Sequence, residues 1–482
     1  MQFQSTRDSA LRVSSSEAIV RGLAPKSGLF VPESFPQADL EGWKSLSYPA
    51  LAEQVLKGFL TDYSADFLHS ATAATYGEAF GGKAGETVKV SDGVYALELW
   101  HGPTCAFKDY ALQLMPKLLV EAKKNLGRTE ITRILVATSG DTGKAALAGY
   151  ADLDGIEIEV FYPNAGTSEI QHLQMATQKG ENVQVYAVEG NFDDAQTGVK
   201  RVFADDTVAA ELEARHIRLS SANSINWGRL VPQIVYYFYA YFRLAEQGAV
   251  EWGKPVDFCV PTGNFGDILA GYYAKQMGLP VGKLICASNK NNVLTDFIKT
   301  GTYDARRTFY KTTSPSMDIL ISSNLERLLL HTSGSAEKVE GWMQELAATG
   351  KYTVDADTLA KIQANFAAGY ADDAAGAAEI RARFERDGYL CDTHTAVAFH
   401  VAEANRSTAP MVVLSTASPF KFPRDVLAAL GETAPESDFA AMAALTAKTG
   451  AAAPASLREL DKLPVRFNTV IQPGEIRAAA LR

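Results

Sequence analysis

Apolar runs of strand length alternate with amphipathic stretches in the middle of the chain. Between Arg133 and Pro163, the sequence predicts a buried strand at 134–138, a tight turn, a helix at 144–153 and a second strand at 156–162. This order is typical of a parallel sheet that is covered by helices on both faces. The pattern therefore predicts an α/β fold.

The same strand and helix unit recurs further along the chain. A strand at 183–188 precedes a helix at 193–204, a strand at 256–261 precedes a glycine-containing loop and a helix at 267–277, and a late strand covers 411–415. In sheets of this kind, ligands bind where the carboxyl ends of strands meet the N-termini of helices. We therefore expect the loops after these strands to form a common site.

The segments outside these units have other patterns. Helical periodicity at 16–23 and 48–60, followed by a glycine-rich join at 81–85, indicates a separate N-terminal domain. Residues rich in Ala, Glu, Lys and Arg near 336–387 indicate helices on the outside of the fold. The expected divisions are an N-terminal domain at 1–94 and a second region at 95–482, which contains a small subdomain at about 132–218, a helical insertion at about 336–387 and a large subdomain formed by the remainder.

Length and charge limit the kinds of partner. The chain has 482 residues, more than one simple core accommodates, so two or three packed domains can enclose a small ligand. Its 46 basic and 56 acidic residues give a formal net charge of -10 without any basic run, which argues against nucleic acid or an anionic membrane as a partner. Neither property determines the oligomeric state.

Cysteine usage and the N-terminal segment indicate the compartment. Cys105, Cys259, Cys286 and Cys391 lie far apart without CxxC or CxxH spacing, so we expect reduced thiols and no metal site. The first eight residues contain no apolar signal segment, and no apolar stretch approaches membrane-spanning length. The expectation is a soluble cytoplasmic protein.

One lysine stands in an unusual setting. The run WHGPTCAFKDY at 100–110 surrounds Lys108 with aromatic and turn-forming residues. An amine in such a pocket loses hydration, which lowers its pKa and leaves a useful fraction neutral and able to form a Schiff base. A single lysine is more often a surface group at a helix start. The rest of the chain favours the chemical role.

A loop between a predicted strand and helix offers a phosphate site. It consists of Gly263, Asn264, Phe265, Gly266 and Asp267. Backbone N–H groups there are not covered by large side chains, and the positive end of a helix dipole adds to them. The spacing is neither the GxGxxG of dinucleotide folds nor the GxxxxGK[ST] of nucleoside triphosphatases, so a compact phosphorylated cofactor fits better. An ordinary structural turn is an equally good interpretation of this loop alone.

The loop after the strand at 134–138 offers a second anion site. Ser139, Gly140, Asp141 and Thr142 provide hydroxyl and amide donors at a helix N-terminus, enough to bind an amino acid carboxylate. A capped helix start is the simpler interpretation of these residues when they are read alone.

A third polar stretch, residues 220–229, precedes an aromatic helix. It contains Ser224, Asn226 and Arg229, and a guanidinium beside amide and hydroxyl groups suits a phosphate ester better than a lysine does. The alternative is a solvated loop with a helix-capping asparagine.

Five motifs together resemble a known family. HGPTCAFKDY, SGDTG, SANSINWGR, TGNFGD and STASPFKF, in this order and spacing, are similar to the threonine synthases, which are pyridoxal 5'-phosphate enzymes of the tryptophan synthase β-like fold. GLAPKSGLFVP near the N-terminus, and TSPSMDI followed by SNLER, resemble further segments of the longer form of that family. The resemblance spans nearly the whole chain. It implies PLP fold type II, with open, mostly parallel sheets flanked by helices.

The resemblance implies a role for each residue around the cofactor. Lys108 would hold the cofactor and later move protons at two substrate carbons, and residues 263–267 would bind the cofactor phosphate. Thr416 would bond the pyridine nitrogen and leave it largely unprotonated. Asp141 would lie near the phenolic oxygen, where some relatives have Asn.

The resemblance also implies the substrate contacts. Ser139, Gly140 and Thr142 would face the substrate. Its phosphate would be bound by Ser224, Asn226, Arg229 and Lys421. Residues 418–420 are Ser-Pro-Phe where relatives often have His-Pro-Ala, so we expect a different shape of the site there.

The implied reaction converts O-phospho-L-homoserine and water to L-threonine and phosphate, the last step of threonine biosynthesis. Phosphate leaves from Cγ, which the cofactor reaches electronically only after protons leave Cα and Cβ, so one mobile base must act twice. The alternatives are a phospholyase or dehydratase on the same fold, which would release a keto acid, and a non-catalytic ligand-binding relative. The glycine loops lack the spacing of a dinucleotide-dependent oxidoreductase.

Overall fold

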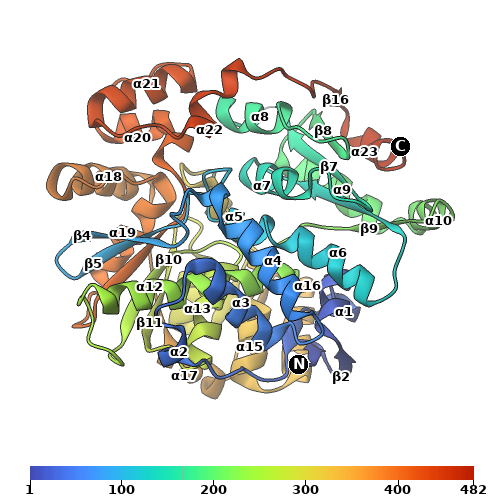
Figure 1. Cartoon of the computed structure of the whole chain (residues 1–482), viewed down its shortest axis with the longest axis horizontal. Coiled ribbons are helices and arrows are strands. Elements are labelled where there is room, and N and C mark those ends of the chain that lie inside the picture. Colours follow the sequence, from blue (N-terminus) through green and yellow to red (C-terminus); the bar gives the residue numbers. More distant parts are fainter. Residues whose placement is uncertain (165–166) are drawn as a thin grey trace.

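Two larger β-sheets organise the chain (Figure 1). This computed structural model describes residues 1–164 and 167–482. In spatial order, the strands of the six-stranded sheet are β14 (Phe366–Tyr370), β11 (Val281–Ser288), β10 (Val256–Pro261), β15 (Met411–Ser415), β5 (Val94–Glu98) and β4 (Glu86–Ser91). All neighbouring strands in it are parallel except β4 and β5. The predicted α/β class with mostly parallel sheets is confirmed.

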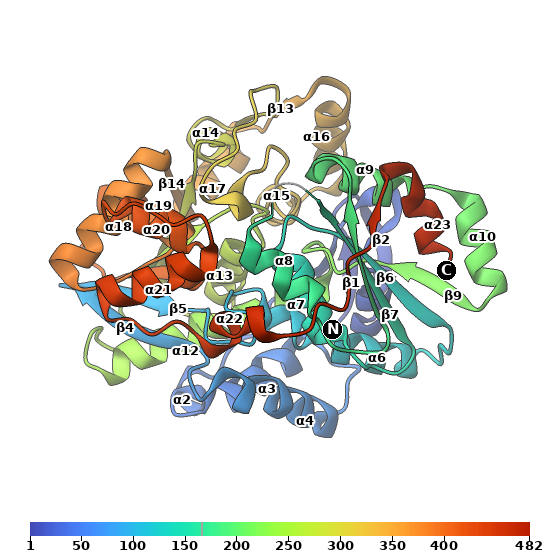
Figure 2. The ribbon, with the colours of Figure 1, turned by 90° about the horizontal axis from the view of Figure 1, so that it is seen from above.

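The five-stranded sheet is parallel throughout. Its spatial order is β16 (Val470–Ile471), β8 (Val183–Val188), β7 (Ile156–Pro163), β6 (Ile131–Ala137) and β9 (Ile217–Ser220). Figure 2 shows how the C-terminal segment returns to this sheet, where β16 adds an edge strand before the chain ends. The C-terminus thus completes a sheet built from a segment far away in the sequence.

Helices occupy the connections between the strands. In the first half of the chain they are α1 (Ser15–Arg21), α2 (Leu40–Trp43), α3 (Tyr48–Phe59), α4 (Ala65–Tyr76), α5 (Asp109–Leu112), α6 (Met115–Asn125), α7 (Asp141–Tyr150), α8 (Glu169–Ala176), α9 (Phe192–Phe203), α10 (Asp206–Ala214), α11 (Trp227–Leu230) and α12 (Ile234–Glu246). In the second half they are α13 (Gly266–Gln276), α14 (Val293–Thr300), α15 (Leu325–Ser333), α16 (Ala336–Thr349), α17 (Ala356–Asn365), α18 (Asp373–Asp387), α19 (Thr393–Ala404), α20 (Pro423–Ala429), α21 (Asp438–Thr449), α22 (Ala455–Arg458) and α23 (Ile476–Ala480). No helix of the described residues is long and apolar enough to cross a membrane.

Strand β10 of the larger sheet is buried on both faces. All its residues are buried, because successive side chains point to opposite faces and both faces are covered. Phe258 and Val260 belong to the hydrophobic core that includes α13. Cys259 points the other way, and its thiol lies 3.2 Å from the carbonyl oxygen of Ala398 in α19. The four cysteines are free and buried.

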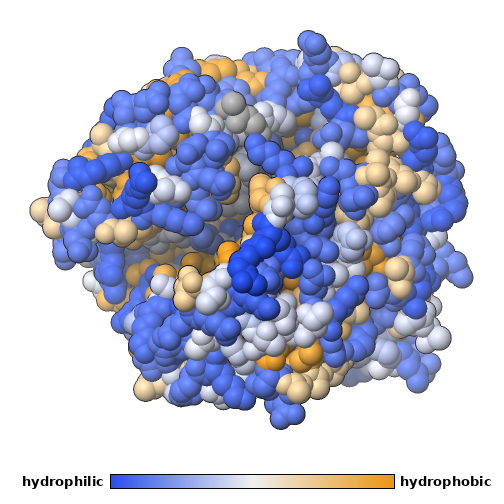
Figure 3. Space-filling view, turned by 180° about the vertical axis from the view of Figure 1, so that it is seen from behind, coloured by the Kyte–Doolittle hydropathy of each residue, from blue (hydrophilic) through white to orange (hydrophobic). Residues whose placement is uncertain are grey.

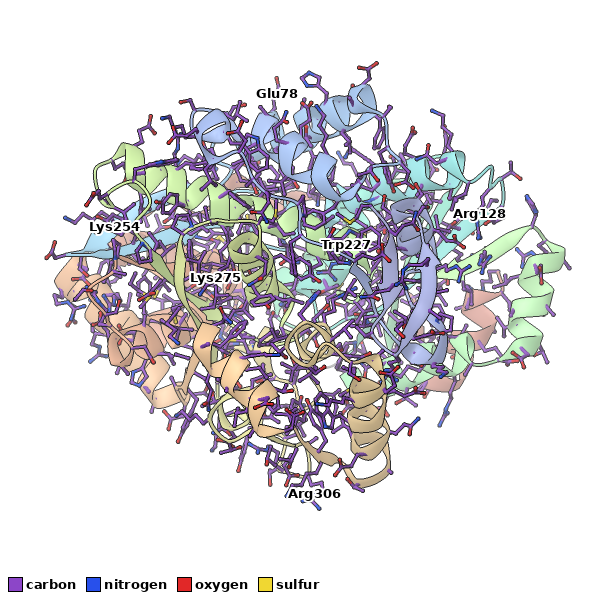
Figure 4. All side chains as sticks on the ribbon, turned by 90° about the horizontal axis from the view of Figure 1, so that it is seen from below. Glu78, Arg128, Trp227, Lys254, Lys275 and Arg306 are labelled. Carbon is purple, nitrogen blue, oxygen red and sulfur yellow. The ribbon has the colours of Figure 1, made fainter. Side chains whose placement is uncertain are left out.

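The N-terminal segment packs onto the rest of the molecule. A small antiparallel sheet is formed by β1 (Phe3–Ser5), β2 (Asp8–Val13) and β3 (Phe30–Pro32). The ring of Phe3 meets that of Trp227 edge to face at 5.1 Å, and Trp227 lies in the middle of the molecule (Figure 4). Arg7 pairs with Glu326 of α15 at 2.7 Å. The N-terminal sheet is therefore attached to the core by both an aromatic contact and an ion pair.

Three features differ from the sequence-based expectations. The prediction of helices alone at 336–387 is wrong for two segments. Residues 366–370 form the edge strand β14 of the larger sheet, and β13 (Lys351–Thr353) pairs with β12 (Thr302–Asp304) in a two-stranded antiparallel sheet. Strand β4, which precedes residue 94, pairs with β5, so the larger sheet includes residues of the expected N-terminal domain. The domain boundary at residue 94 itself stays a prediction. Edge strand β16 was not expected, because two residues carry too little periodicity to be recognised.

Helix α7 touches α5 at a glycine. A Cβ on Gly149 of α7 would lie 1.9 Å from the carbonyl oxygen of Leu112 in α5, a backbone atom that cannot move aside alone. Gly149→Ala should therefore destabilise the protein by about 1–3 kcal/mol, the usual effect of overpacking. Thermal unfolding measures it. Gly341→Ala in α16 is the control, since nothing lies within 4 Å of its Cβ position and alanine favours helix. Equal unfolding midpoints for the two variants would contradict this packing.

Candidate functional site

The loop before Lys108 is held by a buried carboxylate. Asp109 accepts hydrogen bonds from the backbone N–H of Thr104 at 2.8 Å, from the Thr104 hydroxyl at 2.7 Å and from the Gln113 amide at 3.1 Å. Gly102 is required here, because a Cβ at this position would lie 2.5 Å from the Asp109 carboxylate. Burial raises the pKa of Asp109, and the hydrogen bonds from Thr104 oppose this effect. This bonding fixes the turn that presents Lys108.

A second loop is joined to the first. Strand β15 ends at Ser415, and the next residues run antiparallel to the lysine loop, with a β-bridge between Ala106 and Ala417. The N–H of Phe107 donates to the carbonyl oxygen of Thr416 at 2.8 Å. Thr416 is therefore bonded to Phe107, the residue that precedes Lys108.

Asp141 lies between two buried lysines. Its Oδ1 atom is 2.8 Å from Lys421 Nζ, and its Oδ2 atom is 3.7 Å from Lys108 Nζ. The Gln171 amide also donates to Oδ1 at 3.1 Å. Burial opposes ionisation of Asp141, yet the charges of Lys421 and Lys108 outweigh burial and hold its pKa far below the usual range. Asp141 is therefore an anion.

The amine of Lys108 is activated by its surroundings. The side chain is 11% exposed, and Nζ donates to the Ser316 hydroxyl at 3.1 Å. Burial lowers the pKa of Lys108 to about 8; Asp141 opposes this shift, whereas Lys421 and Arg229 add to it. A substantial fraction of the amine is thus neutral near physiological pH, as the sequence predicts.

The glycine loop at 263–267 presents free backbone donors. Phe265, in the left-handed region at φ 64°, precedes α13 without a side-chain cap, and the N–H groups of 263–266 donate to nothing in the described part of the chain. Gly263 packs on the Ser316 loop, where a Cβ would lie 2.7 Å from the Ser316 carbonyl oxygen. This arrangement suits an anion at the helix N-terminus.

The carboxyl group of Asp267 faces away from these donors. It accepts hydrogen bonds from the hydroxyls of Tyr236 at 2.5 Å and Tyr237 at 3.1 Å, both in α12. Burial raises its pKa to about 7, and the two tyrosines oppose that shift. Of the five residues predicted in this loop, Asp267 thus uses its side chain to join α13 to α12.

The loop between β6 and α7 is held by hydrogen bonds to the Thr138 hydroxyl and exposes Ser139. Thr138 accepts from the N–H groups of Gly140 and Gly143, each at 3.0 Å. Gly140 has φ 148° and no room for a Cβ, which would lie 2.5 Å from the Gln171 side chain. Ser139 is exposed and Thr142 is half-buried. Helix α7 begins at Asp141, three residues before the predicted start, and its first turn has no side-chain cap.

The third predicted stretch gives one strong candidate. Arg229 is buried, donates to the carbonyl oxygen of Ala222 at 2.9 Å, and has an Nε atom with no partner among the described residues. Burial lowers its pKa to about 10, so it stays charged. The Asn226 side chain instead caps α11 through Gly228 at 2.8 Å and donates to Ile19 at 2.9 Å. Ser224 is half-buried.

Sequence reasoning missed two residues of the site. Gln171 of α8 contacts Asp141, and Ser316 contacts Lys108. The TSPSMDI motif that contains Ser316 was recognised only as part of the resemblance. No local signal marks Gln171, which is 30 residues from Asp141 in the chain.

His101 of the lysine motif belongs to a neighbouring cluster. Its Nε2 atom lies 2.8 Å from Glu98 and 3.2 Å from Glu86. These three side chains are close enough together to hold a metal ion. The contacts of His101 with the two glutamates also attach the start of the motif to β4 and β5.

The fold and the site together define a class of enzyme. Loops at the carboxyl ends of parallel strands bring a partly neutral, buried lysine beside a helix N-terminus with free N–H groups. Such a lysine can bind a carbonyl group covalently, and such a helix N-terminus can bind a phosphate. This is the site of an α/β enzyme that uses a phosphorylated carbonyl cofactor.

Comparisons with known proteins identify the family. Family models described as Threonine synthase N terminus, Pyridoxal-phosphate dependent enzyme, and Threonine synthase, C-terminal match residues 2–76, 83–416 and 395–478. The threonine synthase of Pseudomonas aeruginosa is 40% identical over 433 residues, covering 88% of this chain and 90% of that protein. Human threonine synthase-like 1 is 42% identical over 431 residues, which span 86% of this chain but only 58% of the human protein.

A solved structure supports the same assignment. The PLP-bound threonine synthase from Brucella melitensis superposes with a TM-score of 0.90 at 38% identity, covering 100% of this chain and 99% of that chain. The chain belongs to the threonine synthase family of pyridoxal-phosphate-dependent enzymes.

The residues present fit pyridoxal 5'-phosphate, the cofactor of this family. The aldehyde of the cofactor requires a partly neutral amine, which Lys108 supplies at a pKa of about 8. The cofactor phosphate requires N–H donors, which the backbone at 263–266 leaves free. A Cβ at Gly263 would strike backbone, so only glycine permits this loop to pack as it does.

The charges around Lys108 predict opposite effects of two substitutions. Lys421→Met removes a neighbouring positive charge and should raise the pKa of Lys108 above about 8, whereas Asp141→Asn should lower it. The pH dependence of Lys108 acetylation by acetic anhydride, followed by peptide mass spectrometry in protein freed of cofactor, measures both. Lys254→Met is the control, because Lys254 lies at the periphery (Figure 4). Shifts in the same direction would contradict this electrostatic arrangement.

Proposed function

We propose that this protein converts O-phospho-L-homoserine and water to L-threonine and phosphate. The observation that carries the proposal is that two separate sources of anion binding surround Lys108, one of them reached through the Ser316 turn, which packs on Gly263 and accepts from the Lys108 amine. The free N–H groups at 263–266 form the first, and the buried guanidinium of Arg229, whose charge lowers the pKa of Lys108, forms the second. When the cofactor phosphate occupies the N–H groups at 263–266, a substrate that carries its own phosphate needs a second anion-binding group, which Arg229 provides.

The cofactor contacts in this proposal come from three loops. Lys108 would hold the aldehyde, Gly263 to Asp267 would hold the phosphate through backbone N–H groups, and Thr416 would bond the pyridine nitrogen. Asp141 would face the phenolic oxygen. When bound, the cofactor supplies an electron-withdrawing ring that stabilises negative charge on substrate carbons.

The substrate contacts divide between two anion sites. Ser139, Gly140 and Thr142 bind the substrate carboxylate at the start of α7. Arg229 binds the substrate phosphate, with Ser224 beside it and Asn226 holding the turn in place through its caps. Lys421 is committed to Asp141 and to the carbonyl oxygen of Thr104, so it contributes charge. Lys108, Lys421 and Arg229 outnumber Asp141, which favours a dianionic phosphate.

Lys108 is the proposed base and acid. Its amine takes a proton from Cα, releases it, and then takes a proton from Cβ; the C–O bond at Cγ breaks, and phosphate leaves with the bonding electrons. The proton from Cβ passes from Lys108 to Cγ, and water adds its oxygen to Cβ while its surplus proton goes to the departing phosphate. A proton then returns to Cα. A pKa near the working pH suits a group that both accepts and donates protons. Asp141, 3.7 Å away, stabilises the ammonium form between these steps.

Product analysis tests the proposed reaction. Incubation of the purified holoenzyme with O-phospho-L-homoserine should yield L-threonine and inorganic phosphate in equal amounts. Lys108→Ala should form neither, because it lacks the amine that binds the cofactor and moves the protons. Release of a keto acid and ammonia in place of threonine would assign the protein to the phospholyases or dehydratases. Absence of turnover together with stable threonine binding would favour a non-catalytic relative.

Arg229→Leu should impair the phosphorylated substrate selectively. A charge-assisted hydrogen bond contributes about 1.5–3 kcal/mol, and leucine makes none. We expect kcat/KM for O-phospho-L-homoserine to fall roughly tenfold to a few hundredfold. Binding of threonine, which has no phosphate, should change far less, and Arg229→Lys should lie between. Equal losses for both ligands would mean that Arg229 supports the fold instead.

A further inference from the structure

Lys108 is connected to two buried residues that have no place in the proposed reaction. Its Nζ atom donates to the Ser316 hydroxyl at 3.1 Å, and the backbone N–H of Ser316 donates to His394 Nε2 at 3.1 Å. His394 Nδ1 lies 2.7 Å from Asp392 Oδ2. His394 is 3% exposed and Asp392 is fully buried. Hydrogen bonds made by the hydroxyl and by the backbone N–H of Ser316 thus link the amine to an internal carboxylate.

The histidine uses both ring nitrogens, which fixes its tautomer. Because the backbone N–H of Ser316 can only donate, Nε2 must accept, and the ring proton on Nδ1 faces Asp392. The ring also packs on Phe422 with centroids 5.0 Å apart. A carboxylate that orients an imidazole in this way sets its direction as well as its tautomer.

The histidine acts on the backbone of a loop that needs external support. Ser316 lies in a short turn, Pro315–Met317, between two longer segments without regular structure. On its other side, the turn packs on Gly263, and Ser322 donates to the Gly263 carbonyl oxygen at 2.8 Å. The Ser316 turn is therefore held between His394 and the glycine loop.

Asp392 also supports the second loop of the site. It caps α19 by accepting from the N–H groups of His394 at 2.9 Å and Thr395 at 3.1 Å. The Thr395 hydroxyl donates to the same carboxylate and accepts from the backbone N–H of Thr416 at 3.2 Å. One buried carboxylate thus supports the segments that carry Ser316 and Thr416.

We propose that Ser316 is a further active-site residue that orients the free amine of Lys108, and that His394 and Asp392 are positioning residues that hold Ser316 in place. The proposal rests on the proposed role of Lys108 as the group that moves protons. A hydroxyl suits this task, because it accepts from the amine in either protonation state and can also donate to the lone pair of the neutral form. The direction of that lone pair is then set while Lys108 is released from the cofactor.

Two substitutions of His394 distinguish its bond to Ser316 from its bond to Asp392. His394→Gln can keep an acceptor near the position of Nε2 and so retain the bond to Ser316, whereas His394→Asn can reach only toward Asp392. His331→Gln is the matched control, because His331 is an internal histidine in a different pair, with Tyr273 at 2.8 Å. Ser316→Ala removes the hydroxyl itself. The thermal unfolding midpoint of each variant separates a general loss of packing from a local effect on Lys108.

The pH dependence of Lys108 acetylation in the full chain without cofactor gives the decisive readout. Loss of the acceptor for the ammonium should raise the neutral fraction of Lys108 at pH 7 by roughly twofold to tenfold, the ratio equivalent to one hydrogen bond. We expect this rise in Ser316→Ala and in His394→Asn, little change in His394→Gln and none in His331→Gln. The double variant Ser316→Ala/His394→Asn should match Ser316→Ala alone. Asp141, Lys421 and Arg229, the charges that act on Lys108, are unaltered in every variant.

Turnover adds a second readout on the holoenzyme. In Ser316→Ala and His394→Asn, kcat should fall by about tenfold while KM changes little, because the amine is released only after substrate has bound. An unchanged Lys108 acetylation profile in His394→Asn, or identical behaviour of the Gln and Asn variants, would overturn the proposal. Acetylation does not depend on the substrate, so a failure of the proposed reaction would not be mistaken for a failure of this chain of bonds.

Discussion

The carboxylate of Asp141 makes it possible to bury two lysines in one site. An ammonium group away from water is costly by several kcal/mol unless an opposite charge is close, and Lys421 is fully buried with Asp141 at 2.8 Å. Lys108 lies farther from Asp141, at 3.7 Å, so the attraction is weaker and does not offset burial, which lowers the pKa of Lys108 to about 8. The close pair therefore stabilises the site, and the distant pair leaves one amine reactive.

The fold supplies this arrangement from separated segments. Lys108 follows β5, Asp141 follows β6 in the other sheet, and Lys421 follows β15. The bridge between Ala106 and Ala417 and the bond from Lys421 to Thr104 join the β5 and β15 loops. The site thus depends on contact between loops that belong to the two sheets, joined by the ion pairs of Asp141 with Lys421 and Lys108.

The elements best predicted from the sequence are the buried strands, because a short apolar run between polar segments has well-defined ends. Strands β8, β10 and β15 have the predicted limits, because they are short, mostly apolar runs, and every residue of β10 and β15 is buried. Aromatic neighbours single out Lys108 in the sequence, and glycine beside helix starts singles out the anion loops; the roles of both stay predictions. The direction of a polar side chain was not predictable: Asp267 and Asn226 point into internal bonds. Ser316, Gln171 and His394 approach the site only through tertiary contacts, which local pattern does not encode.

The most direct test is to identify which lysine carries the cofactor. Two partly buried lysines, Lys108 and Lys144, have pKa values lowered to about 8 mainly by burial, and Lys421 is fully buried nearby, so a lowered pKa or burial alone does not decide among them. Reduction of the holoenzyme with borohydride makes the covalent link permanent, and peptide mass spectrometry then locates it. The account predicts the pyridoxyl group on Lys108 alone; its presence on Lys144 or Lys421 would contradict it.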